Sequence, residues 1–272
     1  MRKQIIITLF FMALLNISCS KAEKKQPNIV IIYADDMGYG DLNIQNADSK
    51  IPTPNLDQLS KEGMRFTDAH SSSGVCTPSR YALLTGRYHW RQGEGIVGSW
   101  GGAWFDENRL TLPAMLREKG YRTACIGKWH LGWEWSAIRN AMVKDKNHPD
   151  AHDWSKPIPG GPLDHGFDYY FGDDVPNFPP YTWIENDRIL EPPTVAFTPI
   201  PAPTNALDGA NRGEGHDTRP GPMVKGWRLD KVMPRLTRKT VDWIGQQSAD
   251  QPFFLYWAWT APHTPVVPIE EY

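Results

Sequence analysis

Residues 28–34 have the sequence Asn-Ile-Val-Ile-Ile-Tyr-Ala and are followed at once by Asp35-Asp36-Met37-Gly38-Tyr39-Gly40. A continuous apolar, β-branched run of this length predicts a strand that is buried on both faces. The Gly-rich polar segment after it predicts a sharp turn. Apolar runs also occur over 121–127, ahead of Lys128 and His130, and over 253–259, ahead of His263. The sequence therefore predicts three buried strands that each end in polar side chains.

Helix signals separate these strands, and helices are expected over 53–63, 77–86, 111–120 and 227–247. The first begins at Thr53-Pro54, with Thr as N-cap and Pro at the first helical position, and ends at Gly63. The last should bend at Pro234, and its apolar stripe consists of Leu229, Val232, Leu236, Val241 and Ile244.

Strands that alternate with helices predict an α/β fold with a mostly parallel sheet and helices on both of its faces. Residues 182–190 are expected to form a hairpin with an Asn-Asp turn. Residues 191–222 are rich in Pro and Gly and lack periodicity, so a long loop is expected there. In such sheets ligands bind outside the carboxyl ends of the strands. The polar residues at those ends are therefore candidate functional residues.

The composition of the 272 residues excludes several classes of protein. A hydrophobic fraction of 40% allows one sizeable core, and a charged fraction of 22% is too ordinary for a disordered chain. The 29 Lys and Arg residues against 31 Asp and Glu residues give a net charge of −2, which argues against a nucleic-acid partner. Only three Cys residues are present, which excludes a disulfide-stapled scaffold.

The N-terminus predicts export. Arg2 and Lys3 precede the apolar run 5–15, which is too short to span a bilayer but suits a secretory signal. Cys19 follows Ser18 at the expected cleavage point and resembles a bacterial lipoprotein signal, although Asn16 stands where such signals carry Leu. Simple cleavage and a retained signal anchor remain alternatives.

We therefore expect a signal peptide over 1–19, a short tether over 20–27 and one catalytic domain over 28–272. The expected location is the periplasm or the outer membrane and cell surface of a bacterium. Contact with a membrane is expected only through the lipid anchor.

The remaining cysteines lie in different surroundings. Cys125 lies in an apolar run and is expected to be a buried thiol, although pairing with Cys76 stays open in an exported protein. In Cys76-Thr77-Pro78-Ser79-Arg80, Pro78 at the first helical position would make Thr77 the N-cap and place Cys76 just ahead of the helix. The helix dipole there favours an anion, either a thiolate or a bound oxyanion, and Arg80 lies close by.

Two adjacent carboxylates at a strand end, Asp35 and Asp36, suit a hard cation such as Ca²⁺ or Mg²⁺. A purely structural turn is the alternative explanation for this pair.

Four segments, in order along the chain from about residue 28 to residue 268, resemble the signature of the type I sulfatases. They are 28–40, Cys76-Thr77-Pro78-Ser79-Arg80 with Leu83-Leu84-Thr85-Gly86-Arg87, Gly127-Lys128-Trp129-His130-Leu131-Gly132, and Ala261-Pro262-His263-Thr264-Pro265. Each motif alone is weak, but chance agreement of all four in order is not expected.

The resemblance implies a fold like that of alkaline phosphatase and hydrolysis of sulfate monoesters. It implies that Cys76 is oxidised to formylglycine by a formylglycine-generating or an anaerobic sulfatase-maturating enzyme. One hydroxyl of the hydrated aldehyde would attack sulfur, and deprotonation of the other would expel sulfate. A plain Ser or Cys lacks this second hydroxyl and would stall as a covalent ester.

The resemblance also assigns roles to single residues. Asp35, Asp36 and position 76 would bind Ca²⁺, with Mg²⁺ as the alternative, and Arg80 would orient the hydrate. Lys128 and His263 would contact the sulfate and the leaving oxygen, and His130 would act as the base for elimination. Taken singly, each of these histidines is more typical of a structural loop residue.

The family completes its metal site with an Asp and an Asn or Gln from a later strand end, and the sequence has no counterpart before Tyr272. Asp173 and Asp174 fall in the wrong place relative to His263. We therefore expect the C-terminal part of the fold to be missing from these 272 residues, with weak metal affinity and little turnover. Robust activity from a protein of this length would contradict that expectation.

Tryptophans gather around the site-bearing segments: Trp90, Trp100, Trp104, Trp129, Trp133, Trp135 and Trp154. Flat aromatic faces can stack on sugars, which favours a sulfated glycan as substrate, and ordinary packing is the alternative. An aryl sulfate substrate stays open. Two other functions stay open. One is a phosphatase or phosphonate hydrolase of the same superfamily, and the other is a non-catalytic protein that binds sulfated polysaccharide.

Overall fold

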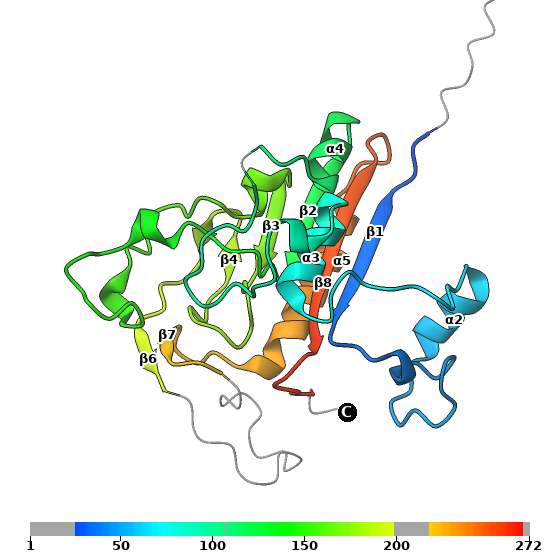
Figure 1. Cartoon of the computed structure of the whole chain (residues 1–272), viewed down its shortest axis with the longest axis horizontal. Helices are drawn as coiled ribbons and strands as arrows, with labels where there is room; N and C mark the ends of the chain where they lie inside the picture. Colours follow the sequence, from blue (N-terminus) through cyan, green and yellow to red (C-terminus); the bar gives the residue numbers. More distant parts are fainter. Residues whose placement is uncertain (1–24, 107, 199–217, 269–272) are drawn as a thin grey trace, which may run out of the picture.

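The computed structural model describes residues 25–106, 108–198 and 218–268 (Figure 1). The expected signal peptide, Cys19 and most of the tether lie outside the described residues, as does the middle of the expected long loop. Within the described part of the chain, no helix has both the length and the apolar character that crossing a membrane requires.

A six-stranded sheet forms the centre of the molecule (Figure 1). In spatial order its strands are β1 (Ile29–Asp35), β8 (Phe253–Pro262), β2 (Arg122–Gly127), β3 (Tyr169–Gly172), β4 (Ile184–Glu185) and β5 (Arg188–Ile189). The first four are parallel, and β4 and β5 continue the sheet in antiparallel pairing. The prediction of a mostly parallel α/β sheet is confirmed.

The last strand of the described chain lies in the middle of the parallel part. Tyr256 of β8 pairs with Ile31 of β1 on one side and with Cys125 of β2 on the other. Near the carboxyl edge, Asp35 is level with Pro262. Segments that are far apart in the sequence therefore end side by side at this edge.

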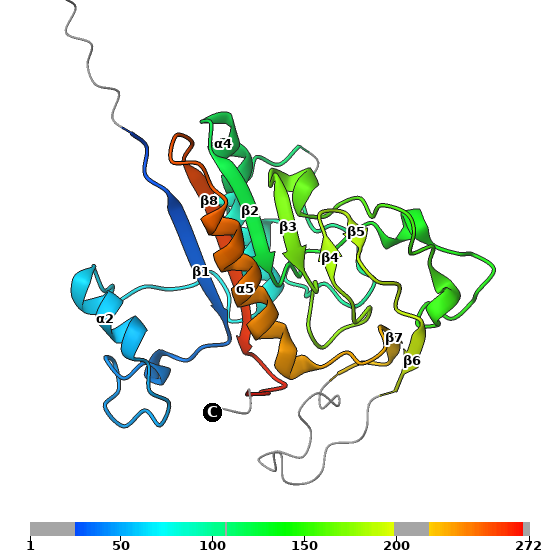
Figure 2. The ribbon, with the colours of Figure 1, turned by 180° about the vertical axis from the view of Figure 1, so that it is seen from behind.

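Helices cover both faces of the sheet. α3 (Cys76–Thr85) and α4 (Leu112–Glu118) lie on the face that is turned to the viewer in Figure 1, and α5 (Val232–Gly245) lies on the opposite face, seen in Figure 2. α2 (Pro54–Glu62) lies beyond β1, away from both layers.

Short elements complete the described fold. The 3-10 turns are η1 (Tyr39–Asp41), η2 (His89–Arg91), η3 (Trp135–Ile138), η4 (Pro149–Ala151), η5 (Pro162–His165) and η7 (Leu229–Lys231). A separate antiparallel pair consists of β6 (Val195–Phe197) and β7 (Gly221–Met223). The prediction of a long loop over 191–222 is therefore wrong near its two ends. Each end contains a strand, and the two strands pair with each other.

Two apolar cores lie on the two sides of the sheet, because successive residues of a strand point to opposite faces. Cys125 packs with Tyr81, Leu84 and Tyr256 beneath α3. Its neighbour Ala124 packs with Leu236 of α5 on the other side. Cys125 is fully buried, as expected, and burial raises the pKa of its thiol. Both Cys125 and Cys76 are free thiols in the structure.

The prediction that the first strand is buried on both faces is wrong. Val30 and Ile32 of β1 are 44% and 43% exposed. Within the described residues β1 pairs only with β8, so one edge and part of one face of β1 are uncovered. A continuous apolar run predicted the strand correctly but could not show what covers it.

The expected apolar stripe of α5 is partly wrong. Val241 and Ile244 are exposed, and the residues that α5 buries are Val232, Leu236, Thr240 and Trp243. The helix also starts later than expected. Because Pro234 lies in its first turn, the missing N–H breaks no helical hydrogen bond, and no bend is required there.

Other predicted ends are confirmed. Thr53 and Gly63 flank α2 as expected. Thr111 precedes α4, and its hydroxyl accepts a hydrogen bond from the Ala114 N–H at 3.2 Å. The hairpin of β4 and β5 turns at Asn186-Asp187, where Asn186 has a φ of 59°.

Candidate active site

The carboxyl edge of the parallel strands brings together candidate residues from three segments. Asp35 is the last residue of β1, and Lys128 follows β2 directly. The cluster is completed by Arg80, which reaches the sheet from α3. Lys128 and Arg80 are fully buried, and Asp35 is only 3% exposed.

The Asp35 carboxylate forms ion pairs with both cations. The Lys128 Nζ lies 2.5 Å from Asp35 Oδ2, and Arg80 Nη2 lies 3.3 Å from Oδ1. Burial alone would raise the pKa of Asp35, but Arg80 and Lys128 outweigh it and hold the pKa below its ordinary value. The group is therefore an ionised carboxylate with two cations, which leaves a net positive charge on these three side chains.

Arg80 is held rigidly. Its Nη1 donates to the Lys128 carbonyl at 2.8 Å and to the Tyr256 hydroxyl at 3.1 Å. Its guanidinium also lies 5.5 Å from the centre of the Tyr33 ring. Burial opposes the charge of Arg80, yet Tyr256, Asp35 and Cys76 keep its pKa above the usual value. Arg80 is thus a fixed cation one helical turn from Cys76.

Cys76 lies inside the first turn of α3, not ahead of it. The N-cap is Val75, whose carbonyl accepts the first helical hydrogen bond from the Ser79 N–H at 3.2 Å. The predicted cap, Thr77, is engaged elsewhere, since its hydroxyl donates to the His130 carbonyl at 2.8 Å and accepts from the Val97 N–H at 3.1 Å. Cys76 is partly exposed, and the positive end of the helix dipole still favours an anion there.

His130 presents one free ring nitrogen. Its Nε2 lies 2.8 Å from the Val97 carbonyl, which can only accept, so Nε2 carries the proton. Nδ1 is then the lone-pair nitrogen, and it is buried without a hydrogen-bond partner in the described structure. Burial, reinforced by Lys128 and Arg80, lowers the pKa of His130 well below 6.5. His130 is therefore neutral near pH 7 and can accept a proton at Nδ1.

Asp36 and His263 form the solvent side of the same edge. The His263 Nε2 lies 3.6 Å from Asp36 Oδ2, and the Asp36 side chain is about half exposed. The other ring nitrogen, Nδ1, contacts the Thr264 carbonyl. All the predicted site residues thus lie on segments that meet at one edge of the sheet, with Asp36 and His263 outermost.

The described residues do not complete a metal site. Asp35 and Asp36 offer the carboxylate oxygens that Ca²⁺ and Mg²⁺ prefer, but Ca²⁺ takes about six to eight oxygen ligands. Asp35 is already paired with Lys128 and Arg80. Within residues 25–106, 108–198 and 218–268, no group of three or more His, Cys, Asp or Glu side chains is arranged to hold a metal ion.

Sequence reasoning set Asp173 and Asp174 aside, yet both lie beside the site at the end of β3. Asp174 Oδ1 accepts the His130 N–H at 3.1 Å, and the Asp174 carbonyl accepts the Trp129 N–H at 3.0 Å. Asp173 is 2% exposed, and its carboxylate has no partner from another described residue. Burial raises the pKa of Asp173 to about 7 and that of Asp174 to about 6. The sequence feature that could have identified Asp173 and Asp174 as site residues is their position directly after a strand, which they share with Asp36.

Three of the seven tryptophans that were expected to stack on sugars belong to the core. Trp129 and Trp133 are fully buried and Trp135 is 4% exposed. Trp90 is 52% exposed, but its ring stacks on Tyr88 at 4.1 Å. Ordinary packing, which was the alternative explanation, therefore accounts for Trp129, Trp133 and Trp135.

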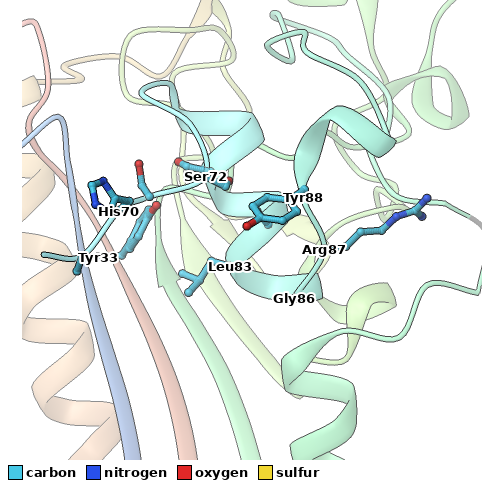
Figure 3. A pocket seen from close by; sticks show the side chains of 11 residues that line it. Tyr33, His70, Ser72, Leu83, Gly86, Arg87 and Tyr88 are labelled. Carbon is cyan, nitrogen blue, oxygen red and sulfur yellow. The ribbon is translucent and has the colours of Figure 1, made fainter.

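A cavity of about 520 Å³ is lined by residues of α3, by Tyr33 of β1 and by residues 69–72 (Figure 3). Tyr33, His70, Leu83 and Tyr88 are among the side chains around it. None of the predicted catalytic residues lines this cavity. The cavity adjoins the candidate site through Tyr33, whose ring lies 5.5 Å from the Arg80 guanidinium.

The fold and the site define an α/β protein of the alkaline-phosphatase-like class. A family model described as Sulfatase matches residues 27–272. The chain belongs to the sulfatase family.

Individual relatives agree with this assignment. The chain is 37% identical to arylsulfatase G of Mus musculus, over 94% of this chain and 45% of that protein. It is 32% identical to the N-acetylgalactosamine-6-O-sulfatase of Bacteroides thetaiotaomicron, over 90% of this chain and 50% of the relative. The chain thus spans about half the length of these curated relatives.

Among solved structures, the chain is similar to BT33336S-sulf, described under the metabolism of multiple glycosaminoglycans by Bacteroides thetaiotaomicron. The TM-score is 0.70 at 27% identity, and the match covers 90% of this chain and 53% of that one. The described fold therefore corresponds to about half of that sulfatase.

Proposed function

We propose that this protein hydrolyses sulfate monoesters of a sulfated glycan, with position 76 supplying the nucleophile. The observation that carries the proposal is the single cluster of Cys76, Arg80, Lys128 and His130 at one strand edge. Family membership supports the reaction, and the name of the N-acetylgalactosamine-6-O-sulfatase relative supports a sulfated sugar as substrate.

The positive charge of the cluster suits an anionic ester. Asp35 neutralises only one of the two buried cations, Lys128 and Arg80. An ammonium has three donors, so Lys128 can keep its bond to Asp35 and donate to a sulfate oxygen as well. His263 lies at the solvent side, and its Nδ1 contacts the Thr264 carbonyl, so it would donate from Nε2 to the leaving oxygen as the doubly protonated ring. These donors act where negative charge develops in the transition state.

Formylglycine at position 76, made by a maturation enzyme, would supply a hydroxyl nucleophile that a thiol does not provide. Around it, Arg80 is fixed by Tyr256 and by the Lys128 carbonyl and would orient the group at position 76. His130 would accept a proton at Nδ1, the ring nitrogen that no described residue occupies.

The calcium ion expected from the resemblance remains a prediction, with Asp35, Asp36 and position 76 as its proposed ligands in this chain. Residues 25–106, 108–198 and 218–268 do not complete a metal site. The roles proposed for Lys128, His130 and His263 are argued from their own contacts. Export to the periplasm or cell surface, with or without lipidation of Cys19, is likewise a proposal that rests on the N-terminal sequence.

Release of sulfate and phosphate from otherwise identical monoesters tests this function. Turnover by these 272 residues is expected to be slow, so release is followed over long incubations; we expect the cleavage that occurs to favour the sulfate ester and Cys76→Ala to abolish it. Cys125→Ala is the matched control, since Cys125 is a core thiol. Preferential cleavage of the phosphate ester would indicate a phosphatase instead. Tight binding of sulfated polysaccharide with no cleavage would indicate a binding protein.

A further inference from the structure

A second basic group lies beside the candidate site but takes no part in the cluster around Asp35. The segment after β3 turns past His130, and the edge of the Phe178 ring meets the His130 ring at 5.3 Å between centres. The guanidinium of Arg219 lies 3.6 Å from the centre of the Phe178 ring. These two contacts, 5.3 Å and 3.6 Å, place the Arg219 charge within about 9 Å of the His130 ring centre.

The backbone of Arg219 is fixed by buried groups. Its N–H donates to the Tyr181 hydroxyl at 2.9 Å, and the same hydroxyl donates to the Arg219 carbonyl at 2.6 Å. The Arg219 N–H also lies 3.2 Å from the Asn177 carbonyl. Tyr181 is 2% exposed and Asn177 is 4% exposed. Arg219 is therefore anchored to the core at the rim of the site.

The charge of Arg219 is open to solvent and to ligands. The residue is exposed, and no described carboxylate lies within ion-pair distance of its guanidinium. Stacking on Phe178 holds the planar group in one place, which lowers the entropy lost when it binds a ligand. A fixed, unneutralised guanidinium is suited to two parallel hydrogen bonds with a planar carboxylate or with two oxygens of a sulfate.

We infer that Arg219, seated on Phe178 beside His130, forms a subsite for a second acidic group of the substrate. This inference rests on the proposed function, because it extends the site for the scissile sulfate by one further anion contact. The substrate class is then a glycan in which the sulfated sugar carries or adjoins another acid, either the carboxylate of a uronic acid or a second sulfate. Arg219 contributes specificity and has no part in bond cleavage.

Three matched disaccharides test the inference. Each carries the scissile sulfate, and the neighbouring position is neutral in the first, a uronate in the second and a sulfate ester in the third. Their dissociation constants are measured by calorimetry in a Cys76→Ala background, so that no ligand is consumed. The KM and kcat values are measured with Cys76 present.

We expect Arg219→Ala to reduce the preference for an acidic over the neutral disaccharide by about tenfold or more. Arg219→Lys should keep part of that preference, since it keeps the positive charge but loses the planar guanidinium that can donate two parallel hydrogen bonds. Arg188→Ala is the control, because Arg188 is an exposed arginine on β5. The disaccharide whose preference collapses most identifies the second acid as carboxylate or sulfate.

An unchanged preference in Arg219→Ala would overturn the inference. So would an equal loss for all three disaccharides together with a lower melting temperature, since that result would make Arg219 a structural clamp. Failure of the proposed function would look different: the unaltered protein would neither bind nor cleave any of the three sulfated disaccharides.

Discussion

At the scale of single residues, the site depends on side chains that orient one another. His130 receives its orientation from outside its own motif, because Asp174 accepts its N–H and Val97 accepts its Nε2–H. Asp174 binds the backbone N–H, and the Val97 contact at Nε2 decides which ring nitrogen remains available. The motif Gly127–Gly132 predicted that His130 lies at a strand end, but it could not predict partners that lie 33 and 44 residues away along the chain.

Asp174 is predicted to act as a positioning residue for His130. Asp174→Ala removes the acceptor for the His130 N–H, and we expect kcat on a sulfate ester to fall about 10- to 100-fold with a small change in KM. Asp174→Asn keeps an oxygen at the same place and should retain most of the activity. Equal losses in the two variants would argue against a role through this hydrogen bond.

The raised pKa of Asp173 should make the free energy of unfolding depend on pH. Its pKa is about 7 in the folded protein against an ordinary value of 3.8, so the folded state binds the proton more tightly than the unfolded state. Its contribution to the free energy of unfolding is therefore present at acid pH and is lost as the pH rises toward 7 and above.

Asp173→Asn removes the carboxylate that must ionise in a buried place. We expect the variant to be more stable than the unaltered protein by about 2–4 kcal/mol at pH 8 and nearly equal to it at pH 4. Urea denaturation at the two pH values measures this difference. A gain of the same size at both pH values would show that ionisation of Asp173 is not its cause.

At the scale of elements, close packing of the strands dictates local sequence more strictly than helix ends do. Gly127 ends β2 with a φ of 115°, and a Cβ there would lie 1.8 Å from the Ala258 carbonyl oxygen. Gly86 ends α3 with a φ of 63°, and a Cβ there would meet nothing within 4 Å. Both are glycines at positive φ, but only Gly127 also faces a neighbouring backbone.

These two glycines form a matched pair of variants. Gly86→Ala should cost about 1 kcal/mol, the strain of a left-handed residue alone. Gly127→Ala should cost more than about 4 kcal/mol, because the clash moves β2 against β8 at the point that positions Lys128. Thermal unfolding of both variants checks the difference. Similar losses would mean that the two strands can separate without penalty.

Sequence patterns predicted elements better than their surroundings. The apolar runs predicted β1, β2 and β8, and the Thr-Pro and Gly signals predicted both ends of α2. The start of α3 was wrong because the Thr77 hydroxyl bonds to residues 97 and 130, contacts that no local signal reveals. The exposure of Val30 and Ile32 was missed for a related reason, since burial depends on which strands lie alongside.

At the scale of the whole molecule, the described structure has a well-packed body and a loosely attached arm. None of the residues from 36 to 76 is buried, and α2, within this stretch, lies beyond β1 (Figure 2). Residues 36–76 form this arm, and its exposed apolar side chains include Ile51, Leu59, Met64 and Phe66. Cys76 lies where this arm joins the buried part of α3.

We expect backbone amides in residues 37–70 to exchange with deuterium far faster than those of β2 and β8, because no buried contact protects them. Hydrogen exchange followed by mass spectrometry of peptides measures this directly. Protection of 37–70 equal to that of the central strands would show that the arm is held by contacts beyond those of the described residues.

The central claim is that position 76 carries the nucleophile of a sulfate-ester hydrolase. The most direct test is the mass of the peptide that spans Cys76, taken from a preparation whose sulfatase activity has been measured. We predict the mass of formylglycine or its hydrate at position 76, in proportion to the activity. An active preparation in which this peptide carries only the unmodified thiol would contradict the account.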